Sequence, residues 1–121
     1  MFEVLALMLL SHQPLQPITQ GMASYYTVAS SSLVTASGEV LDDKELTCAM
    51  PVGEFGSYYL IVADNGKSVV CRLNDRGPFA KGRVIDLSKA AMRKLCATSG
   101  TIQVTVYGLG QNVPPQAVAT N

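Results

Sequence analysis

Two strand-like runs joined by a short turn most constrain how this chain can fold. The runs SYYLIVA (57–63) and SVVCRLN (68–74) are rich in β-branched and aromatic residues, and DNGK stands between them. Asn-Gly is the strongest short-range signal of a β-hairpin, because both residues tolerate the positive φ angles that tight hairpin turns need. The sequence therefore predicts an antiparallel pair of strands in the middle of the chain.

Further short elements lie on both sides of this hairpin. GMASYYTV (21–28) and TIQVTVYGL (101–109) read as strands, and in the second run Ile102, Val104 and Val106 are expected to face inward. SKAAMRKLC (88–96) has a helical pattern, and DDKELT (42–47) is long enough for a single helical turn. Several short strands with one or two short helices predict a mainly β fold closed into a barrel.

The length and the charge of the chain limit the classes of function. One domain is expected from 121 residues, and a formal net charge of zero without a basic run argues against nucleic-acid binding. We expect an apolar arm and linker over 1–20, the barrel over 21–110 and an extended tail over 111–121. The apolar run at the start has ten residues, whereas a helix that spans a membrane needs about twenty. It also has no basic residue before the apolar run, so we expect neither a membrane span nor a signal peptide.

The cysteine pattern argues against a metal site. Cys48, Cys71 and Cys96 have no CxxC spacing, and His12 lies far from them in sequence. We expect no metal and no cofactor, and small apolar core roles for all three cysteines. A Cys48–Cys71 bridge stays open as an alternative if the chain folds in an oxidising compartment.

The segment RLNDRGPFAKGRVIDLS (72–88) contains two aspartates and three arginines, which are charged groups that acid–base chemistry could use. Asp75 follows a predicted strand, and Asp86 precedes the predicted helix. One interpretation is structural, with Asp75 in a turn and Asp86 as the N-cap of the helix. The other is a site that cleaves carbohydrate.

Four motifs in this order favour a site role for Asp75 and allow both roles for Asp86: GMASYYT (21–27), TASGEVLDDKELTCAM (35–50), SVVCRLNDRGPFAKGRVIDLSKAAMRKL (68–95) and IQVTVYGLG (102–110). Together they resemble the rare lipoprotein A (RlpA) family over residues 21–110. The resemblance implies a six-stranded double-psi β-barrel, the fold shared with expansins. It also implies peptidoglycan glycan strands as the partner, and action at the bacterial cell wall.

Members of the family include lytic transglycosylases, and the resemblance implies that Asp75 is the catalytic residue. Ordinary glycosidases need two carboxylates. A lytic transglycosylase uses the 6-hydroxyl of the muramic acid sugar as an internal nucleophile, so that one carboxyl group can first donate and later accept the proton. Other positions of the motifs are expected to bind substrate, namely Tyr25, Glu39, Asp42, Met50, Arg72, Asn74, Arg76 and Asp86. Arg72 could equally pair with Asp75.

One position departs from the family pattern. The family reads LTAAH where this chain reads LTCAM, so Met50 stands in place of a functional histidine. Methionine carries no proton and makes only weak hydrogen bonds. Three hypotheses therefore stay open: an active lytic transglycosylase, a module that binds glycan strands without cleaving them, and a structural part of a wall-penetrating assembly. For the last, we expect the arms to contact other chains of a phage tail or secretion apparatus, and a virion or secretion machine to carry the protein to the wall.

Overall fold

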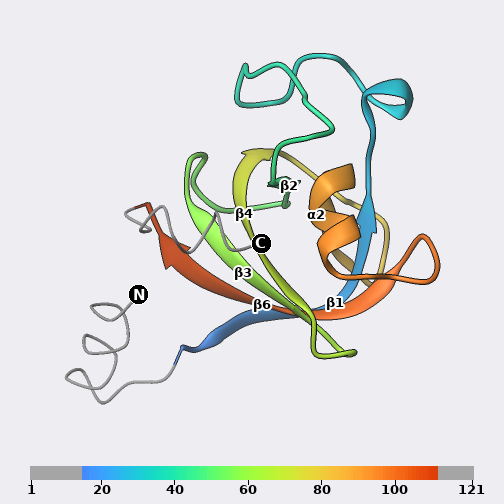
Figure 1. Ribbon diagram of the computed structural model, residues 1–121. Helices are drawn as coiled ribbons and strands as arrows, with labels where there is room; N and C mark the ends of the chain where they lie inside the picture. The colour runs from blue at the N-terminus through green and yellow to red at the C-terminus, as the bar shows by residue number, and fades with distance from the viewer. Residues whose placement is uncertain (1–14, 112–121) are drawn as a thin grey trace.

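The computed structural model describes residues 15–111, which form a closed six-stranded barrel with one α-helix packed on it (Figure 1). Its elements are β1 (Pro17–Tyr25), the 3-10 turn η1 (Val28–Ser30), β2 (Thr47–Ala49), β3 (Tyr58–Ala63), β4 (Ser68–Asp75), β5 (Arg83–Leu87), α2 (Lys89–Lys94) and β6 (Ile102–Gly110). The predicted fold class is confirmed. The predicted helical turn at 42–47 is wrong for this stretch, where the Glu45 N–H donates to the Asp42 carbonyl in a simple turn.

The strand order around the barrel is β1-β5-β2-β4-β3-β6, with β1 also paired to β6. The pairs β1–β5 and β2–β4 are parallel, and the other four pairs are antiparallel. Most strands that are neighbours in the barrel are not consecutive in the sequence. The antiparallel pair of β2 and β5 lies between the two parallel pairs. This arrangement sets segments 47–49, 72–75 and 85–87 side by side.

The hairpin predicted from Asn65-Gly66 joins β3 to β4. Leu60 pairs with Val70, and Gly66 closes the turn at a φ of 86°. The Ala63 N–H donates to the Lys67 carbonyl at 2.8 Å. The turn therefore fixes the register of the strand that ends at Asp75.

The helix α2 begins one residue after Ser88, whose hydroxyl accepts the Ala91 N–H. The prediction that Asp86 is the N-cap is therefore wrong. Asp86 lies inside β5, where the strand continues to Leu87 before the helix starts. Ser88 is the better cap because its short side chain lies next to the free N–H groups of the first turn.

The interior of the barrel is apolar and comes from alternating strand positions. Val104 and Val106 are buried as predicted, and Ile102 packs partly buried against the core. The other large side chains that are fully buried include Ile61, Val69, Leu73, Ile85, Leu87 and Leu95.

The boundary predicted after residue 20 falls inside the barrel, because β1 begins at Pro17 and pairs with β6 from that residue on. The rest of the predicted arms, residues 1–14 and 112–121, lies outside the described residues. Within residues 15–111, no helix is both long and apolar enough to cross a membrane.

Candidate functional site

Asp75 is the last residue of β4, and two backbone N–H groups hold one oxygen of its carboxylate. Its Oδ1 atom accepts the Ala36 N–H and the Arg76 N–H, each at 2.9 Å. Its Oδ2 atom has no protein partner within residues 15–111. The half-buried carboxyl group is therefore oriented by the backbone and keeps one oxygen available for proton transfer.

Strand pairing places the second carboxylate of the motif near the first. Ala49 of β2 pairs with Asp75 of β4 on one side and with Asp86 of β5 on the other. Because neighbouring strands lie about 4.8 Å apart, the two aspartates are about 10 Å apart at the backbone. The Ser24 hydroxyl of β1 donates to Asp86 Oδ1, which fixes the second carboxylate.

The surface between the two aspartates is covered by Tyr26 and Leu41, which pack on Ala49 as a small separate cluster. The Tyr26 hydroxyl and Thr47 Oγ1 are 3.1 Å apart. Burial raises the pKa of Tyr26 well above its ordinary value, and the nearby charge of Asp75 adds to the effect. Tyr26 is therefore a neutral phenol beside Asp75, although the sequence interpretation singled out Tyr25.

Glu39 is bound to β4 by two side chains. Arg72 Nη1 lies 2.8 Å and 2.7 Å from the two Glu39 oxygens, and Asn74 Nδ2 donates to Oε1 at 3.1 Å. These contacts, with that of Arg72 the largest, hold the pKa of Glu39 below its ordinary value. Glu39 is thus an ionised partner of Arg72 rather than a proton donor. Arg72 also lies 3.5 Å from Glu45, and the alternative pairing of Arg72 with Asp75 is not found within the described residues.

Arg76 is engaged by the 51–56 loop. Its Nη2 atom donates to the Gly53 carbonyl at 2.7 Å, and its guanidinium carbon lies 4.1 Å from the centre of the Phe55 ring. Its Nη1 atom is buried and has no partner in the described part of the chain. The structure therefore shows Arg76 fixing a loop beside Asp75, and its predicted contact with substrate stays a prediction.

Met50 follows β2 directly, and its N–H donates to the Asp75 carbonyl at 3.2 Å. Its side chain is only 3% exposed and belongs to the core cluster. What remains accessible lies at a hollow of about 250 Å³ that Ile18, Val52 and Val84 help to line. The predicted contact of Met50 with substrate would have to be made at that hollow.

Within the described residues, no hydrogen bond or ion pair joins Asp42 or Tyr25 to Asp75 or Asp86. Asp42 is exposed and its carboxylate accepts the Lys44 N–H, which stabilises a turn. Tyr25 is 45% exposed and lines a shallow hollow beside α2 with Lys89 and Met92. Their predicted roles in binding substrate stay predictions.

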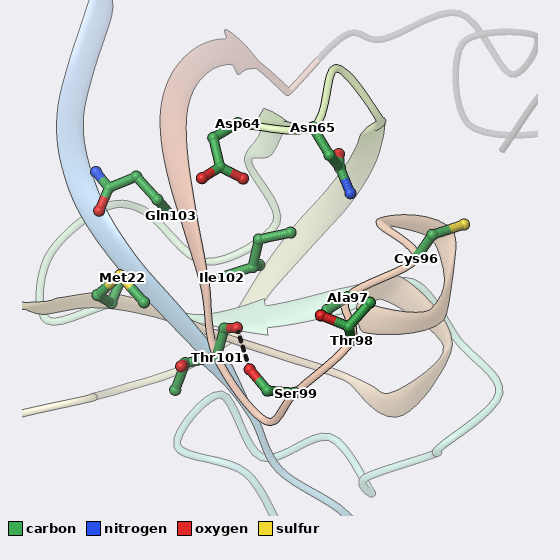
Figure 2. Close-up of a pocket in the computed structure, with 10 residues that line it drawn as sticks. All are labelled: Met22, Asp64, Asn65, Cys96, Ala97, Thr98, Ser99, Thr101, Ile102 and Gln103. Atoms are coloured by element: carbon green, nitrogen blue, oxygen red, sulfur yellow. Dashed lines mark hydrogen bonds between the residues drawn. The ribbon is translucent and has the colours of Figure 1, made fainter.

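A larger hollow, of about 410 Å³, lies at the other end of β4 (Figure 2). Asp64 and Asn65 of the hairpin border it on one side, and Ser99 and Thr101 on another, where the Ser99 hydroxyl donates to the Thr101 carbonyl. Because β4 runs from Ser68 beside this hairpin to Asp75, the hollow is separated from the carboxylate by the length of the strand. Within the described residues, no cluster of His, Cys, Asp and Glu fits a metal ion.

The closed, mixed six-stranded barrel is that of a protein of the double-psi β-barrel class. The family model described as "Lytic transglycolase" matches residues 18–106, and the chain belongs to this family.

Curated relatives agree with this assignment. The chain is 46% identical over 91 residues to the endolytic peptidoglycan transglycosylase RlpA of Pseudomonas aeruginosa, which covers 74% of this chain and 27% of the relative. It is 36% identical over 107 residues to the endolytic peptidoglycan transglycosylase RlpA of Haemophilus influenzae, covering 85% of this chain and 37% of the relative. The chain thus spans roughly a third of the length of these relatives.

Solved structures share the fold at lower identity. A Streptomyces papain inhibitor superposes with a TM-score of 0.61 at 22% identity, covering 79% of this chain and 97% of the inhibitor. A mutant Clavibacter michiganensis expansin in complex with cellohexaose superposes with a TM-score of 0.62 at 17% identity, covering 80% of this chain and 52% of the expansin. At these identities the likeness extends to the fold alone.

Proposed function

We propose that the protein is a peptidoglycan lytic transglycosylase that acts through Asp75. The observation that carries this proposal is the one-sided hold on its carboxylate, with Oδ1 bound by two backbone N–H groups and Oδ2 free of protein partners within residues 15–111. Membership of the lytic transglycolase family supports it, as do the names of the curated relatives. A protein with this activity works in the bacterial periplasm or cell envelope.

The reaction needs one carboxyl group in two roles. Protonated Oδ2 of Asp75 gives its proton to the glycosidic oxygen as the bond to C1 breaks. The 6-hydroxyl of the muramic acid sugar then bonds to C1 and returns its proton to Oδ2, so that a 1,6-anhydro end forms without water. The backbone N–H groups of Ala36 and Arg76 keep the carboxyl group in place through both steps.

The Asp75→Asn variant tests this proposal. We expect it to lower the rate at which 1,6-anhydro ends appear from peptidoglycan stripped of stem peptides by about 10²–10⁴-fold, because an amide cannot donate and recover the proton. Mass spectrometry of the products measures the rate. Asp64→Asn, at the other end of β4, is the matched control and should keep the wild-type rate. Equal rates for Asp75→Asn and wild type would contradict the role of Asp75.

A second candidate function is a module that binds glycan strands without cleaving them. It is favoured by Met50, which packs in the core where the family has a functional histidine. In that case wild type would sediment with insoluble peptidoglycan and release no anhydro products. This outcome would exclude lytic transglycosylase activity and support binding of glycan strands without cleavage.

Met50→His separates the two candidates further. We expect the variant to cleave faster than wild type, because it restores the histidine of the family pattern, a residue that can carry a proton near neutral pH. We also expect a stability loss of about 1–3 kcal/mol, since a polar ring would enter the apolar core. Denaturant unfolding measures the stability, and the anhydro-product assay measures the rate. Unchanged cleavage by a folded variant would show that a histidine at this position is not what limits catalysis.

The setting in a phage tail or secretion apparatus remains a proposal. It rests on the apolar and proline-rich character of the terminal segments, which lie outside residues 15–111. Deleting residues 1–14 and 112–121 together should abolish co-purification with a larger particle. Retained co-purification would remove the basis of this proposal.

A further inference from the structure

Two thiols meet inside the barrel. Cys48 of β2 and Cys71 of β4 are both fully buried, and their sulfur atoms are 2.8 Å apart, with the Cys71 thiol donating to Cys48. The strands that carry them are parallel neighbours, with Cys48 paired to Leu73. Cys96 is exposed and lies outside the barrel strands, so the prediction of a core role is wrong for this cysteine.

We propose that Cys48 and Cys71 form an internal disulfide when the chain folds in an oxidising compartment. A disulfide needs its sulfur atoms about 2.05 Å apart, and the two sulfur atoms, now 2.8 Å apart, would have to move roughly 0.8 Å closer. The bond would join residues 23 positions apart and would link β2 to β4 inside the core. It would therefore hold the strand that ends at Asp75 against the segment that leads to Met50.

The oxidant is a disulfide, such as oxidised glutathione or the disulfide of a thiol oxidoreductase. One cysteine thiolate attacks the external disulfide, which forms a mixed disulfide and releases one thiolate. The second cysteine thiolate then attacks the mixed disulfide and releases the other. Two protein thiols are oxidised, the external disulfide is reduced to two thiols, and the two protons pass to the released thiolates.

This chemistry must take place before the barrel closes. Only a thiolate attacks a disulfide, and burial raises the pKa of Cys48 well above its ordinary value. In the folded protein Cys48 and Cys71 are also fully shielded from any external reagent. We therefore expect bridging during folding and very slow bridging of the folded, reduced protein.

The experiment folds the full chain from denaturant in a glutathione redox buffer and then counts free thiols by alkylation under denaturing conditions. We expect a single alkylated cysteine, Cys96, and a Cys48–Cys71 peptide pair in a non-reducing digest. The matched control, Cys96→Ser, should fold with the same bridge and show no alkylated cysteine. Three alkylated cysteines, or a bridge that maps to Cys96, would overturn the proposal.

A second measurement compares the bridged and the reduced forms of the wild-type protein. The bridged wild type should melt roughly 5–20 °C above the same protein kept reduced, because the bond restricts the unfolded chain. A bridged form that melts no higher than the reduced form would contradict the proposal that the folded barrel accommodates this bond. Neither readout involves cleavage of glycan, so failure here is distinct from failure of the proposed function.

Discussion

At the scale of single residues, the carboxylates of Asp75 and Glu39 differ in the groups that they contact. Asp75 contacts backbone N–H groups through one oxygen, whereas both oxygens of Glu39 contact the guanidinium of Arg72. A carboxylate paired with a cation is held in its charged form and is a poor acid. Glu39 is therefore the poorer proton donor of the two, in agreement with the proposed role of Asp75, and its contacts help to fix β4.

The pair formed by Glu39 and Arg72 gives a prediction for pH dependence. The pKa of Glu39 should lie below the ordinary 4.5 in the folded protein and rise toward it in Arg72→Gln. Because the folded pKa is the lower one, the stability from this pair is present above pH 4.5 and is lost as the pH falls through the folded pKa. Glu39 is 43% exposed, so solvent screening limits that stability to about 0–1 kcal/mol. NMR titration of the carboxyl carbon measures the pKa.

Arg93→Gln, on the exposed side of α2, is the control for this titration and should leave Glu39 unchanged. A Glu39 pKa that is the same in Arg72→Gln and in wild type would show that Arg72 is not the cause of the shift.

At the scale of elements, one serine joins three parts of the fold. The Ser88 hydroxyl accepts the N–H groups of Ala91 and Thr47 and donates to the Glu45 carbonyl at 2.6 Å. These contacts tie the start of α2 to β2 and to the 42–45 turn. Since β2 lies between β4 and β5, the position of Ala49 between the two aspartates depends on this junction.

Removing that hydroxyl should weaken the whole domain. We expect Ser88→Ala to lower the free energy of unfolding by about 1–3 kcal/mol, because it removes a helix cap and leaves buried polar groups without partners. Urea unfolding followed by circular dichroism measures the loss. Ser99→Ala, which removes an exposed hydroxyl, should change stability by less than about 0.5 kcal/mol. Equal losses in the two variants would mean that the buried contacts of Ser88 contribute little.

At the scale of the whole molecule, the closed barrel couples the site to the core. β4 carries buried Leu73 toward the interior and, two residues later, Asp75 at its end. Every strand has two neighbours in the closed order, so a shift of β4 would disturb both β2 and β3. The barrel thus positions the carboxylate through the packing of the strand that carries it.

A cavity under the site should therefore affect both stability and activity. We expect Leu73→Ala to lower the free energy of unfolding by about 2–5 kcal/mol, since the surrounding side chains refill the space only partly. The cleavage rate should also fall in the variant that remains folded. Leu33→Ala is the matched control, because Leu33 is 58% exposed and should cost no more than about 0.5 kcal/mol. Wild-type stability of Leu73→Ala would contradict the closely packed interior described above.

Local patterns in the sequence were enough to predict the main elements and the family. Asn65-Gly66 predicted the hairpin because a tight turn requires a residue at positive φ, which Gly66 provides. The alternation in 102–106 predicted the buried face of β6 because side chains on a strand alternate. The motif order located Asp75 at the end of a strand. These features depend on neighbouring residues and can be recognised without knowing the fold.

Which distant residues meet became visible only in the folded barrel. Ala36 holds Asp75 across 39 positions, and Arg72 pairs with Glu39 rather than Asp75. The sequence left a Cys48–Cys71 bridge open as an alternative, and the folded barrel places the two sulfur atoms 2.8 Å apart. Met50 was expected to contact substrate, and only the closed barrel showed it packed in the core. Contacts of this kind depend on how β2, β4 and the 26–46 segment come together. No local pattern encodes that arrangement, because packing across the whole chain determines it.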